Sequence, residues 1–310
     1  MAKTKILFIA HEMSPFLELT KIAKITRQLP QAMQEKGFEI RILMPRFGNI
    51  NERRNRLHEV IRLSGMNIVI NENDNPLIIK VASLPTARMQ VYFLDNEEYF
   101  QRKQVFRDAK EKFFDDNDER MIFFCKGAIE TVKKLGWMPD VVHCMGWMSS
   151  LVPMYLKTAY REDPMFKNTK VVYSVYENCF TENLDKNLKT KALTPDMNAT
   201  DAALLKDSSC SSLHISAINY SDAFINLIHR DDCIQIIKEL IAKNVWNKTL
   251  NACADTHPKK RDFYTKEFKK EGRNNPTFKE FFPNEYKIIN SDLLKSILNF
   301  NFIHSDLMRY

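Results

Sequence analysis

Two β-rich runs of the sequence carry side chains that could contact a ligand. Residues 139–151 read as a buried strand that breaks into a helix, and they contain His143 and Trp147. Residues 170–176 form a second β-rich run that ends in Tyr176. A histidine can bond a hydroxyl group or exchange a proton near neutral pH, and an aromatic ring can stack on an apolar ligand face. We therefore predict a binding site around these three side chains, next to Glu177 and Asn178.

Two of these side chains also have a plainer explanation. A histidine at the end of a buried strand is easily a core residue bonded to a backbone carbonyl, and a tryptophan that opens a helix more often packs than stacks on a ligand. Both explanations stay open for His143 and Trp147. The histidines of the chain show no spacing typical of metal ligands, so we expect no metal and no cofactor.

The elements that would position these residues alternate between strand and helix. Residues 116–135 carry apolar residues at helical spacing, with Asp116 and Glu119 at the spacing of a capping box. The opening of the chain repeats the pattern, with a strand, a helix and a strand at residues 5–10, 19–35 and 38–45. Such units form a doubly wound, mainly parallel sheet, in which ligands bind at the carboxyl ends of the strands.

Two regions depart from this alternation. Short β-like runs at residues 66–70, 77–84 and 89–94 are separated by turn residues and indicate an antiparallel insertion. The compact domain closes near residue 225. Residues 230–310 are charged and largely helical, and they are too short for a second nucleotide-binding domain.

Composition excludes several classes of function. The net charge is only +7, and basic residues are interleaved with acidic ones, so nucleic-acid binding is disfavoured. The apolar run at residues 6–10 is far too short for a signal peptide or a membrane span. Six cysteines without a Cys-x-x-Cys pair predict reduced thiols. We expect a cytoplasmic protein that binds neither nucleic acid nor membrane.

Five motifs carry a family resemblance. They are Glu12-x-x-Pro15-Phe16, Leu29-Pro30, Met44-Pro45-Arg46-Phe47-Gly48, Asp116-Asn117-x-x-Arg120, and Pro139-Asp140-Val141-Val142-His143 with Trp147. In this order they resemble the amino-terminal catalytic domain of bacterial glycogen synthase and starch synthase, which are glycosyltransferases of family 5. The resemblance covers roughly residues 5–225.

The resemblance implies a Rossmann-like domain of the GT-B fold. In that family two such halves enclose a cleft, and glucose passes from ADP-glucose to the non-reducing end of an α-1,4-glucan with retention of configuration. The amino-terminal half chiefly receives the acceptor, and the carboxyl half supplies most contacts to the nucleotide. We expect one amino-terminal domain over residues 1–229, followed by a divergent tail over residues 230–310.

One loop departs from the family pattern. Where the family has Lys-Thr-Gly-Gly-Leu-Ala-Asp, this chain has Glu18 in place of the lysine that meets the diphosphate, and a carboxylate repels phosphate. Thr20 and Lys21 replace two glycines whose backbone N–H groups approach phosphate oxygens. Lys21 or Lys24 could restore a positive charge, because a flexible ammonium group reaches from a neighbouring position. We predict a degenerate donor loop that disfavours ADP-glucose.

The acceptor side has also changed. The family's second histidine and its aspartate are Met145 and Gly146 here, and neither can exchange a proton. We therefore assign no catalytic residue. The residues that we expect to bind substrate, or to support the loops that do, are His143, Trp147, Tyr176, Asn117, Arg120 and Glu12.

The sequence thus predicts a glycogen or starch synthase-like domain of α-1,4-glucan synthesis. By family it is an ADP-glucose-dependent hexosyltransferase with an α-glucan as acceptor, and we expect weak or no activity from this chain alone. A partner protein could supply a second domain. The alternative is a non-catalytic glucan-binding or scaffold subunit with a regulatory role.

Overall fold

The computed structural model describes residues 3–84, 87, 89–176, 179–226, 230–246, 250, 252–256, 260–270, 290–306 and 308–309. The chain divides into two compact units. The sheet unit comprises Met1–Phe224 and Trp246–Lys248, and the tail unit comprises Ile225–Val245 and Thr249–Tyr310.

One mixed sheet organises the sheet unit. Its strands are β1 (Lys5–Ala10), β2 (Glu39–Pro45), β3 (His58–Glu59), β4 (Met66–Ile70), β5 (Asn73–Leu84), β6 (Met89–Asp95), β7 (Val141–Met145), β8 (Lys170–Val175) and β9 (Ala223–Asn226). They lie in the order β3-β5-β6-β2-β1-β7-β8-β9, with β4 paired to β5. The pairs β6–β2, β2–β1, β1–β7 and β7–β8 are parallel, as predicted for a doubly wound sheet.

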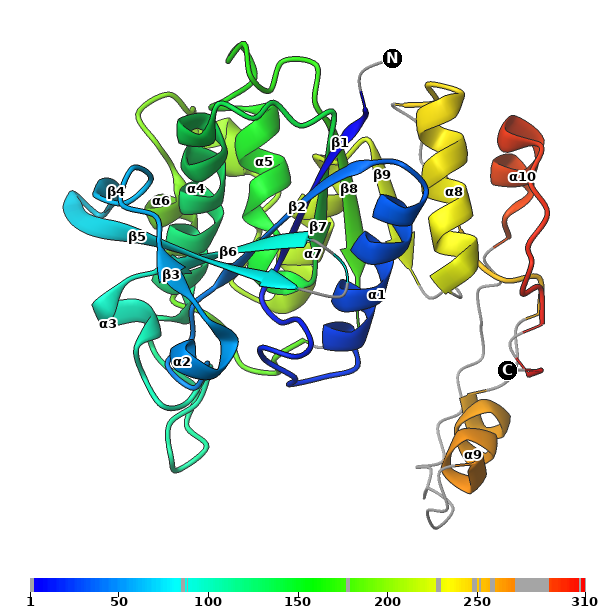
Figure 1. The fold of residues 1–310 in the computed structure, drawn as a ribbon, viewed down its shortest axis with the longest axis horizontal. Helices are drawn as coiled ribbons and strands as arrows, with labels where there is room; N and C mark the ends of the chain where they lie inside the picture. Colours follow the sequence, from blue (N-terminus) through cyan, green and yellow to red (C-terminus); the bar gives the residue numbers. More distant parts are fainter. Residues whose placement is uncertain are drawn as a thin grey trace. The chain divides into compact units, whose positions relative to one another are not determined.

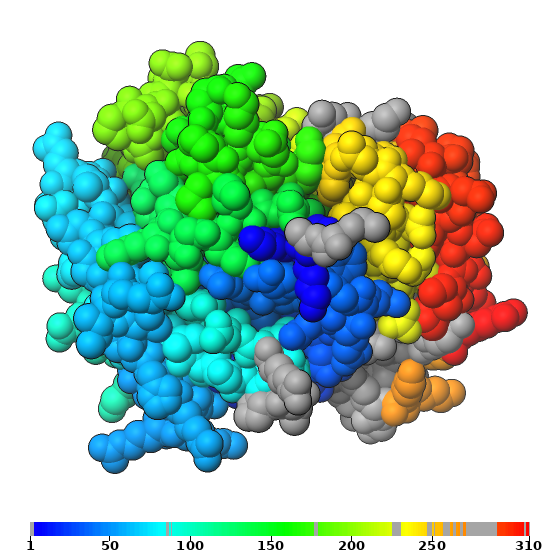
Figure 2. Space-filling view, turned by 45° about the horizontal axis from the view of Figure 1, so that its top comes forward, coloured from blue at the N-terminus to red at the C-terminus, as the bar shows by residue number. Residues whose placement is uncertain are grey.

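Helices and short helical turns connect these strands. Their bounds are α1 (Ile22–Glu35), α2 (Glu52–Asn55), α3 (Glu97–Phe100), α4 (Asn117–Leu135), η1 (Trp147–Ser149), α5 (Leu151–Lys157), α6 (Leu188–Ala192), η2 (Ala199–Ala202) and α7 (Cys210–Asn219). Figure 1 shows α1 on one side of the central strands and α4 with α5 on the other. The space-filling view in Figure 2 shows the blue surface of the segment that contains α1 beside the cyan surface of β5 and β6.

Burial explains why these segments form these elements. Every residue of β7 is buried, and β1 is buried from Ile6 to Ala10, because helices cover both faces of a parallel sheet. The predicted helix over 116–135 becomes α4, which ends at Gly136 with a left-handed φ of 62° that a glycine adopts without strain. α4 is buried on most of its surface, because it also packs against α5, α6 and β4.

The antiparallel insertion is confirmed, but it is not separate from the main sheet. β5 pairs antiparallel with β4 and β6, and β6 pairs in parallel with β2. The apolar residues of β6, among them Val91 and Phe93, therefore extend the same core. The periodicity of each run indicates a strand, but it does not say which neighbour the strand chooses.

The expectation of reduced thiols throughout is wrong in one place. Cys179 and Cys210 form a disulfide with their Cα atoms 5.8 Å apart. Cys125, Cys144 and Cys233 are buried cysteines outside this disulfide, and Cys253 is a half-buried one.

The tail unit is helical in its described residues. It contains α8 (Arg230–Ala242), α9 (Lys260–Lys270) and α10 (Asp292–Leu298). Asp232 is fully buried, and its carboxylate accepts hydrogen bonds from the backbone N–H groups of Ile303 and His304. Within the described part of both units, none of the helices combines the length and apolar composition needed to cross a bilayer.

Gly48 offers a test of how tightly the loop after β2 is packed. A Cβ atom there would lie 2.3 Å from the carbonyl oxygen of Arg102 and 2.7 Å from backbone atoms of Gln101. Backbone atoms cannot move away as the end of a flexible side chain can. We therefore expect Gly48→Ala to lower the free energy of unfolding by about 1–3 kcal/mol.

The matched control is Gly127→Ala in α4, where a Cβ would meet flexible side chains of Leu94 and Leu77 at 3.1–3.7 Å. Urea unfolding of both variants measures the difference. Equal stability of the two variants would show that this packing constraint is wrong.

Candidate functional site

The first turn of the predicted site is organised by a buried carboxylate. Glu12, directly after β1, is fully buried, and its Oε2 accepts hydrogen bonds from the backbone N–H groups of Leu19 and Thr20 at 2.9 and 2.8 Å. Its Oε1 accepts the hydroxyl of Thr20 at 2.6 Å. Both N–H groups belong to the turn that precedes α1, whose first residue is Ile22. In this structure an internal carboxylate takes them.

The pKa of Glu12 records this arrangement. Burial raises the pKa, but hydrogen bonding and charge interaction with His11, together with the bonds from Thr20, outweigh burial and hold the pKa below its ordinary value. The imidazole Nε2 of His11 lies 3.5 Å from the Glu12 carboxylate. The carboxylate is therefore ionised near neutral pH, and negative charge already occupies the centre of the turn.

The remaining residues of the predicted donor loop are exposed. Glu18 accepts the hydroxyl hydrogen bond of Ser14 at 2.6 Å, which fixes a second carboxylate beside the turn. Thr20, Lys21 and Lys24 are exposed on the same segment. The loop therefore brings together two carboxylates and two ammonium groups.

His143 lies in the core of the sheet. It is 1% exposed, its Nε2 lies 2.7 Å from the Ser174 hydroxyl on the neighbouring strand, and its ring packs 5.1 Å from that of Phe8. Burial lowers the pKa of His143 to about 3, so the imidazole is neutral. In this state the ring can hold a hydroxyl group in place but does not face solvent.

Trp147 is covered by other rings. It is 2% exposed, with Phe106 and Phe180 at 5.0 Å between ring centroids and His11 at 6.1 Å. We call these four residues the aromatic cluster. Three of them come from loops after β1, after β7 and after β8, so the cluster lies at the carboxyl edge of the parallel strands, where the sequence places the site.

Asn117 and Arg120 hold the loop that carries Phe106. Both are fully buried at the start of α4. Arg120 donates to the carbonyl oxygens of Tyr99 and Val105 at 2.7 and 2.6 Å and to Oδ1 of Asn117 at 2.6 Å. The amide of Asn117 donates to the Phe106 carbonyl at 2.9 Å. The two side chains thus fix the backbone on both sides of residue 105 and position one ring of the aromatic cluster.

Among the residues that the structure describes, no carboxylate contacts the guanidinium group of Arg120 directly. Its centre lies 5.4–5.9 Å from the rings of Phe47, Phe100, Phe106 and Phe114. Burial lowers the pKa of Arg120 to about 9, which still leaves it charged near neutral pH. The predicted capping box beside it is wrong, because Asp116 makes no cap bond and instead pairs with Arg102.

Tyr176 differs from the other predicted residues because it is only half-buried. It directly follows β8 at the same carboxyl edge. Glu177 and Asn178 lie outside the described residues. Of the side chains that the sequence predicts as ligand groups, Tyr176 is therefore the one that reaches the surface among those the structure describes.

The sequence misses the residues that tie these loops together. Phe106 and Phe180 complete the aromatic cluster, and Arg107 pairs with Glu182 through two bonds of 2.5 and 2.9 Å. This ion pair joins the loop before α4 to the loop after β8. Both phenylalanines lie in loops, outside the periodic pattern of a helix or a strand. Such residues are the sequence signal that could have indicated the cluster.

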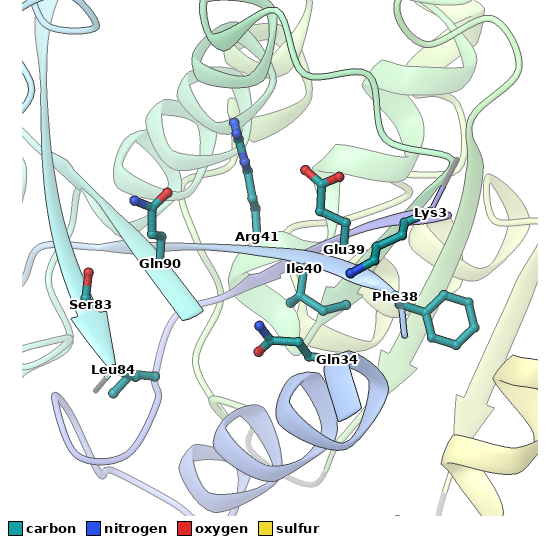
Figure 3. A pocket seen from close by; sticks show the side chains of 9 residues that line it. All are labelled: Lys3, Gln34, Phe38, Glu39, Ile40, Arg41, Ser83, Leu84 and Gln90. Carbon is teal, nitrogen blue, oxygen red and sulfur yellow. The ribbon is translucent and has the colours of Figure 1, made fainter. Parts of the chain in front are cut away.

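A hollow of about 580 Å³ lies at the opposite edge of the sheet. It is bordered by the start of β2 and the end of β5, and Figure 3 shows Glu39 and Arg41 directed to one face of β2 and Ile40 to the other. Glu39 accepts a bond of 2.6 Å from the indole of Trp137, and Arg41 lies over the same ring at 4.8 Å. Both side chains thus pack against Trp137, and the carboxyl edge remains the candidate site.

Known proteins resemble this chain over its first three quarters. The family model described as the starch synthase catalytic domain matches residues 5–227. A glycogen synthase of Chlorobium luteolum is 43% identical over 173 residues, which is 56% of this chain and 35% of that protein. One from Chlorobaculum parvum is 34% identical over 253 residues, which is 81% of this chain and 51% of the relative. The chain thus spans about half the length of these relatives, or less.

A solved structure shares the fold. The catalytic domain of starch synthase IV from Arabidopsis thaliana, bound to ADP and acarbose, matches with a TM-score of 0.61 and 15% identity. The match covers 81% of this chain and 51% of that one. The mostly parallel sheet of this chain therefore has the GT-B glycosyltransferase fold, in keeping with the prediction.

The ionised state of Glu12 gives a pH-dependent contribution to stability. Because its pKa in the folded protein lies below the unfolded value, near 4.3, the contribution is present above that value and disappears as the pH falls through the folded pKa. We expect Glu12→Gln to be less stable than the wild type at pH 7 and to lose less stability between about pH 5 and pH 3.

Thermal unfolding at several pH values measures this, with Glu35→Gln on the exposed end of α1 as control. If all three proteins lose the same stability across the acid range, Glu12 does not carry the charge that the geometry assigns to it.

Proposed function

The chain belongs to the starch synthase catalytic domain family, and on that premise we propose that it acts on the acceptor side of α-1,4-glucan synthesis. In this role it presents an α-glucan at the carboxyl edge of β1, β7 and β8. It transfers glucose from ADP-glucose weakly or not at all by itself. A second domain that clamps the nucleotide, on another chain or on a further segment, would complete a transferase.

The first turn after β1 is the single observation that carries this proposal. The backbone N–H groups of Leu19 and Thr20 are bonded to Glu12, and Glu18 places a further carboxylate beside them. A nucleotide diphosphate would have to displace one carboxylate and approach the other. The family uses a lysine where Glu18 stands.

The size of the electrostatic effect supports the proposal. Two unit charges about 4 Å apart in water interact by about 1 kcal/mol. Replacing an attractive lysine by a repulsive glutamate beside two phosphate charges therefore weakens binding by roughly 4 kcal/mol. This corresponds to about a thousandfold in affinity, since each 1.4 kcal/mol is a factor of ten. Lys21 and Lys24 offset part of this effect, and salt screens the charge of Glu18 as it does theirs, because all three side chains are exposed.

We propose that the predicted acceptor residues divide into two groups. His143, Trp147, Asn117, Arg120 and Glu12 are buried and form the floor that positions the loops. Tyr176 is half-buried at the end of β8 and offers its ring to the apolar face of a glucose unit. The buried group supports binding without contacting the sugar.

The aromatic cluster favours a second candidate function. The rings that resemble sugar-binding groups are covered by Phe106 and Phe180, and Met145 and Gly146 offer no group for proton transfer. A non-catalytic subunit that binds glucan, or that acts as a scaffold for a synthase, needs neither open catalytic groups nor a donor site. We propose this regulatory role as the alternative.

Restoring the donor loop tests the first function. We expect the triple variant Glu18→Lys, Thr20→Gly, Lys21→Gly to bind ADP-glucose, while the wild type binds it no more tightly than about 1 mM. The reason is that the variant returns both the charge and the space that a diphosphate needs. Isothermal titration with ADP-glucose measures it, and Glu35→Gln, which changes the net charge by the same +1, is a charge-matched control that should behave as the wild type.

Wild-type binding in the micromolar range would contradict the proposal. So would transfer of labelled glucose from ADP-glucose to glycogen by the wild-type protein that is abolished in His143→Ala. Either result would show that the first turn accepts the donor as it stands.

Glucan binding separates the two candidates. We expect maltoheptaose to bind the wild type and Tyr176→Ala to weaken it about tenfold, because a stacked ring contributes about 0.5–1.5 kcal/mol beyond its buried area. Tyr220→Ala, at another half-buried tyrosine, is the control and should bind as the wild type does. Titration that gives no heat with maltoheptaose, together with a stable complex with a synthase, would favour the scaffold.

A further inference from the structure

Three potential metal ligands from separate parts of the sequence meet beside the end of β8. Cys179 lies in the exposed loop after β8, Cys210 is the first residue of α7, and His214 lies one turn later on the same face of that helix. The imidazole Nε2 is 3.1 Å from Sγ of Cys179 and 3.5 Å from Sγ of Cys210. All three ligand atoms lie within 4.8 Å of one another.

A buried tyrosine fixes which nitrogen of His214 faces the sulfurs. Nδ1 lies 2.7 Å from the hydroxyl of Tyr173, and the same hydroxyl lies 3.3 Å from the carbonyl oxygen of Gly146. The carbonyl can only accept, so the one hydroxyl proton goes to it, and the tyrosine oxygen accepts Nδ1–H. The free lone pair of the neutral imidazole is then on Nε2, aimed at the two sulfurs.

The disulfide does not satisfy this lone pair. Neither sulfur of a disulfide carries a proton to donate, whereas two thiols could each supply one and a metal ion could accept the lone pair directly. The cluster is therefore better matched to its reduced state than to the oxidised one.

We propose that, once the disulfide is reduced, Cys179, Cys210 and His214 bind a thiophilic divalent cation, with Zn²⁺ as the best match. Cysteine sulfur and histidine nitrogen are the ligands that Zn²⁺ prefers, and in a tetrahedral site they stand about 3.5–4 Å apart. Two thiolates neutralise the charge of the ion, as a partly buried site requires. Tyr173 orients the histidine through its other nitrogen, in the manner of groups that support zinc ligands.

The chemistry of the exchange balances with a dithiol reductant. Its thiolate attacks the exposed Cys179 sulfur, the Cys179–Cys210 bond takes up two electrons and two protons, and the reductant becomes its own disulfide. Zn²⁺ then displaces the two thiol protons. A water molecule from the solvent that reaches Cys179 fills the fourth position.

Histidine spacing along the chain predicts no metal site, because it compares histidines only with one another. The fold brings the three residues together by placing the start of α7 against the end of β8. The cluster also borders the candidate site, since Phe180 of the aromatic cluster follows Cys179 directly.

Zinc uptake by the reduced protein tests the proposal. The full chain is reduced, freed of reductant and metal under nitrogen, and titrated with Zn²⁺ in a calorimeter. We expect one site in the reduced wild type and none in the oxidised protein. Cys179→Ser and His214→Ala should weaken binding at least a hundredfold, and Tyr173→Phe about tenfold to a hundredfold. Cys253→Ser, at a cysteine outside this cluster, should bind as the wild type does.

Two results would overturn the proposal. One is a reduced wild-type protein that takes up no Zn²⁺, and the other is uptake that is unchanged in Cys179→Ser and His214→Ala. Circular dichroism checks that each variant folds. If a variant does not fold, the comparison of reduced and oxidised wild type and the conservative Tyr173→Phe variant decide the question.

Discussion

The bonding of the Glu12 carboxylate is the interaction on which the candidate site depends. A buried carboxylate is costly unless it is paired or hydrogen-bonded, and Glu12 meets this requirement by collecting two backbone N–H groups and one hydroxyl from the turn that follows it. The turn is therefore wrapped around a negative charge. Glu12 belongs to a motif that the chain shares with the family, so these bonds fix the shape of the turn, and we propose that Glu18 is the change that disfavours a diphosphate there.

A second set of bonds organises the other side of the site. Arg120 and Asn117 hold three carbonyl oxygens of residues 99–106, which places Phe106 against Trp147. The Arg107–Glu182 pair then connects this loop to the loop after β8. In that second loop, Phe180 also packs against Trp147. The buried bonds of Arg120 and Asn117 thus fix the loop before α4, the half-exposed Arg107–Glu182 pair ties it to the loop after β8, and Phe106 and Phe180 pack against Trp147. Among the described residues of this edge, Tyr176, Phe106 and Phe180 carry half-exposed rings.

The sequence predicted the strands and helices well because their burial follows a simple period. β1, β7, β8 and α4 lie where apolar runs, helical spacing and Gly136 place them. α1 begins at Ile22 rather than Leu19, because Glu12 draws Leu19 and Thr20 out of the helix. The prediction of a capping box is wrong for a similar reason, because the Asp116 side chain pairs with Arg102 instead. The meeting of Cys179, Cys210 and His214 depends on tertiary contacts between distant segments, which no local pattern records.

The central claim is that the turn after β1 is closed to a nucleotide diphosphate by its own carboxylates. The most direct measurement is a crystal structure of the protein grown with ADP-glucose at millimolar concentration. We expect Glu12 to remain bonded to Leu19 and Thr20, with no diphosphate at that turn. A diphosphate held by the N–H groups of Leu19 and Thr20, with Glu12 displaced from them, would contradict it.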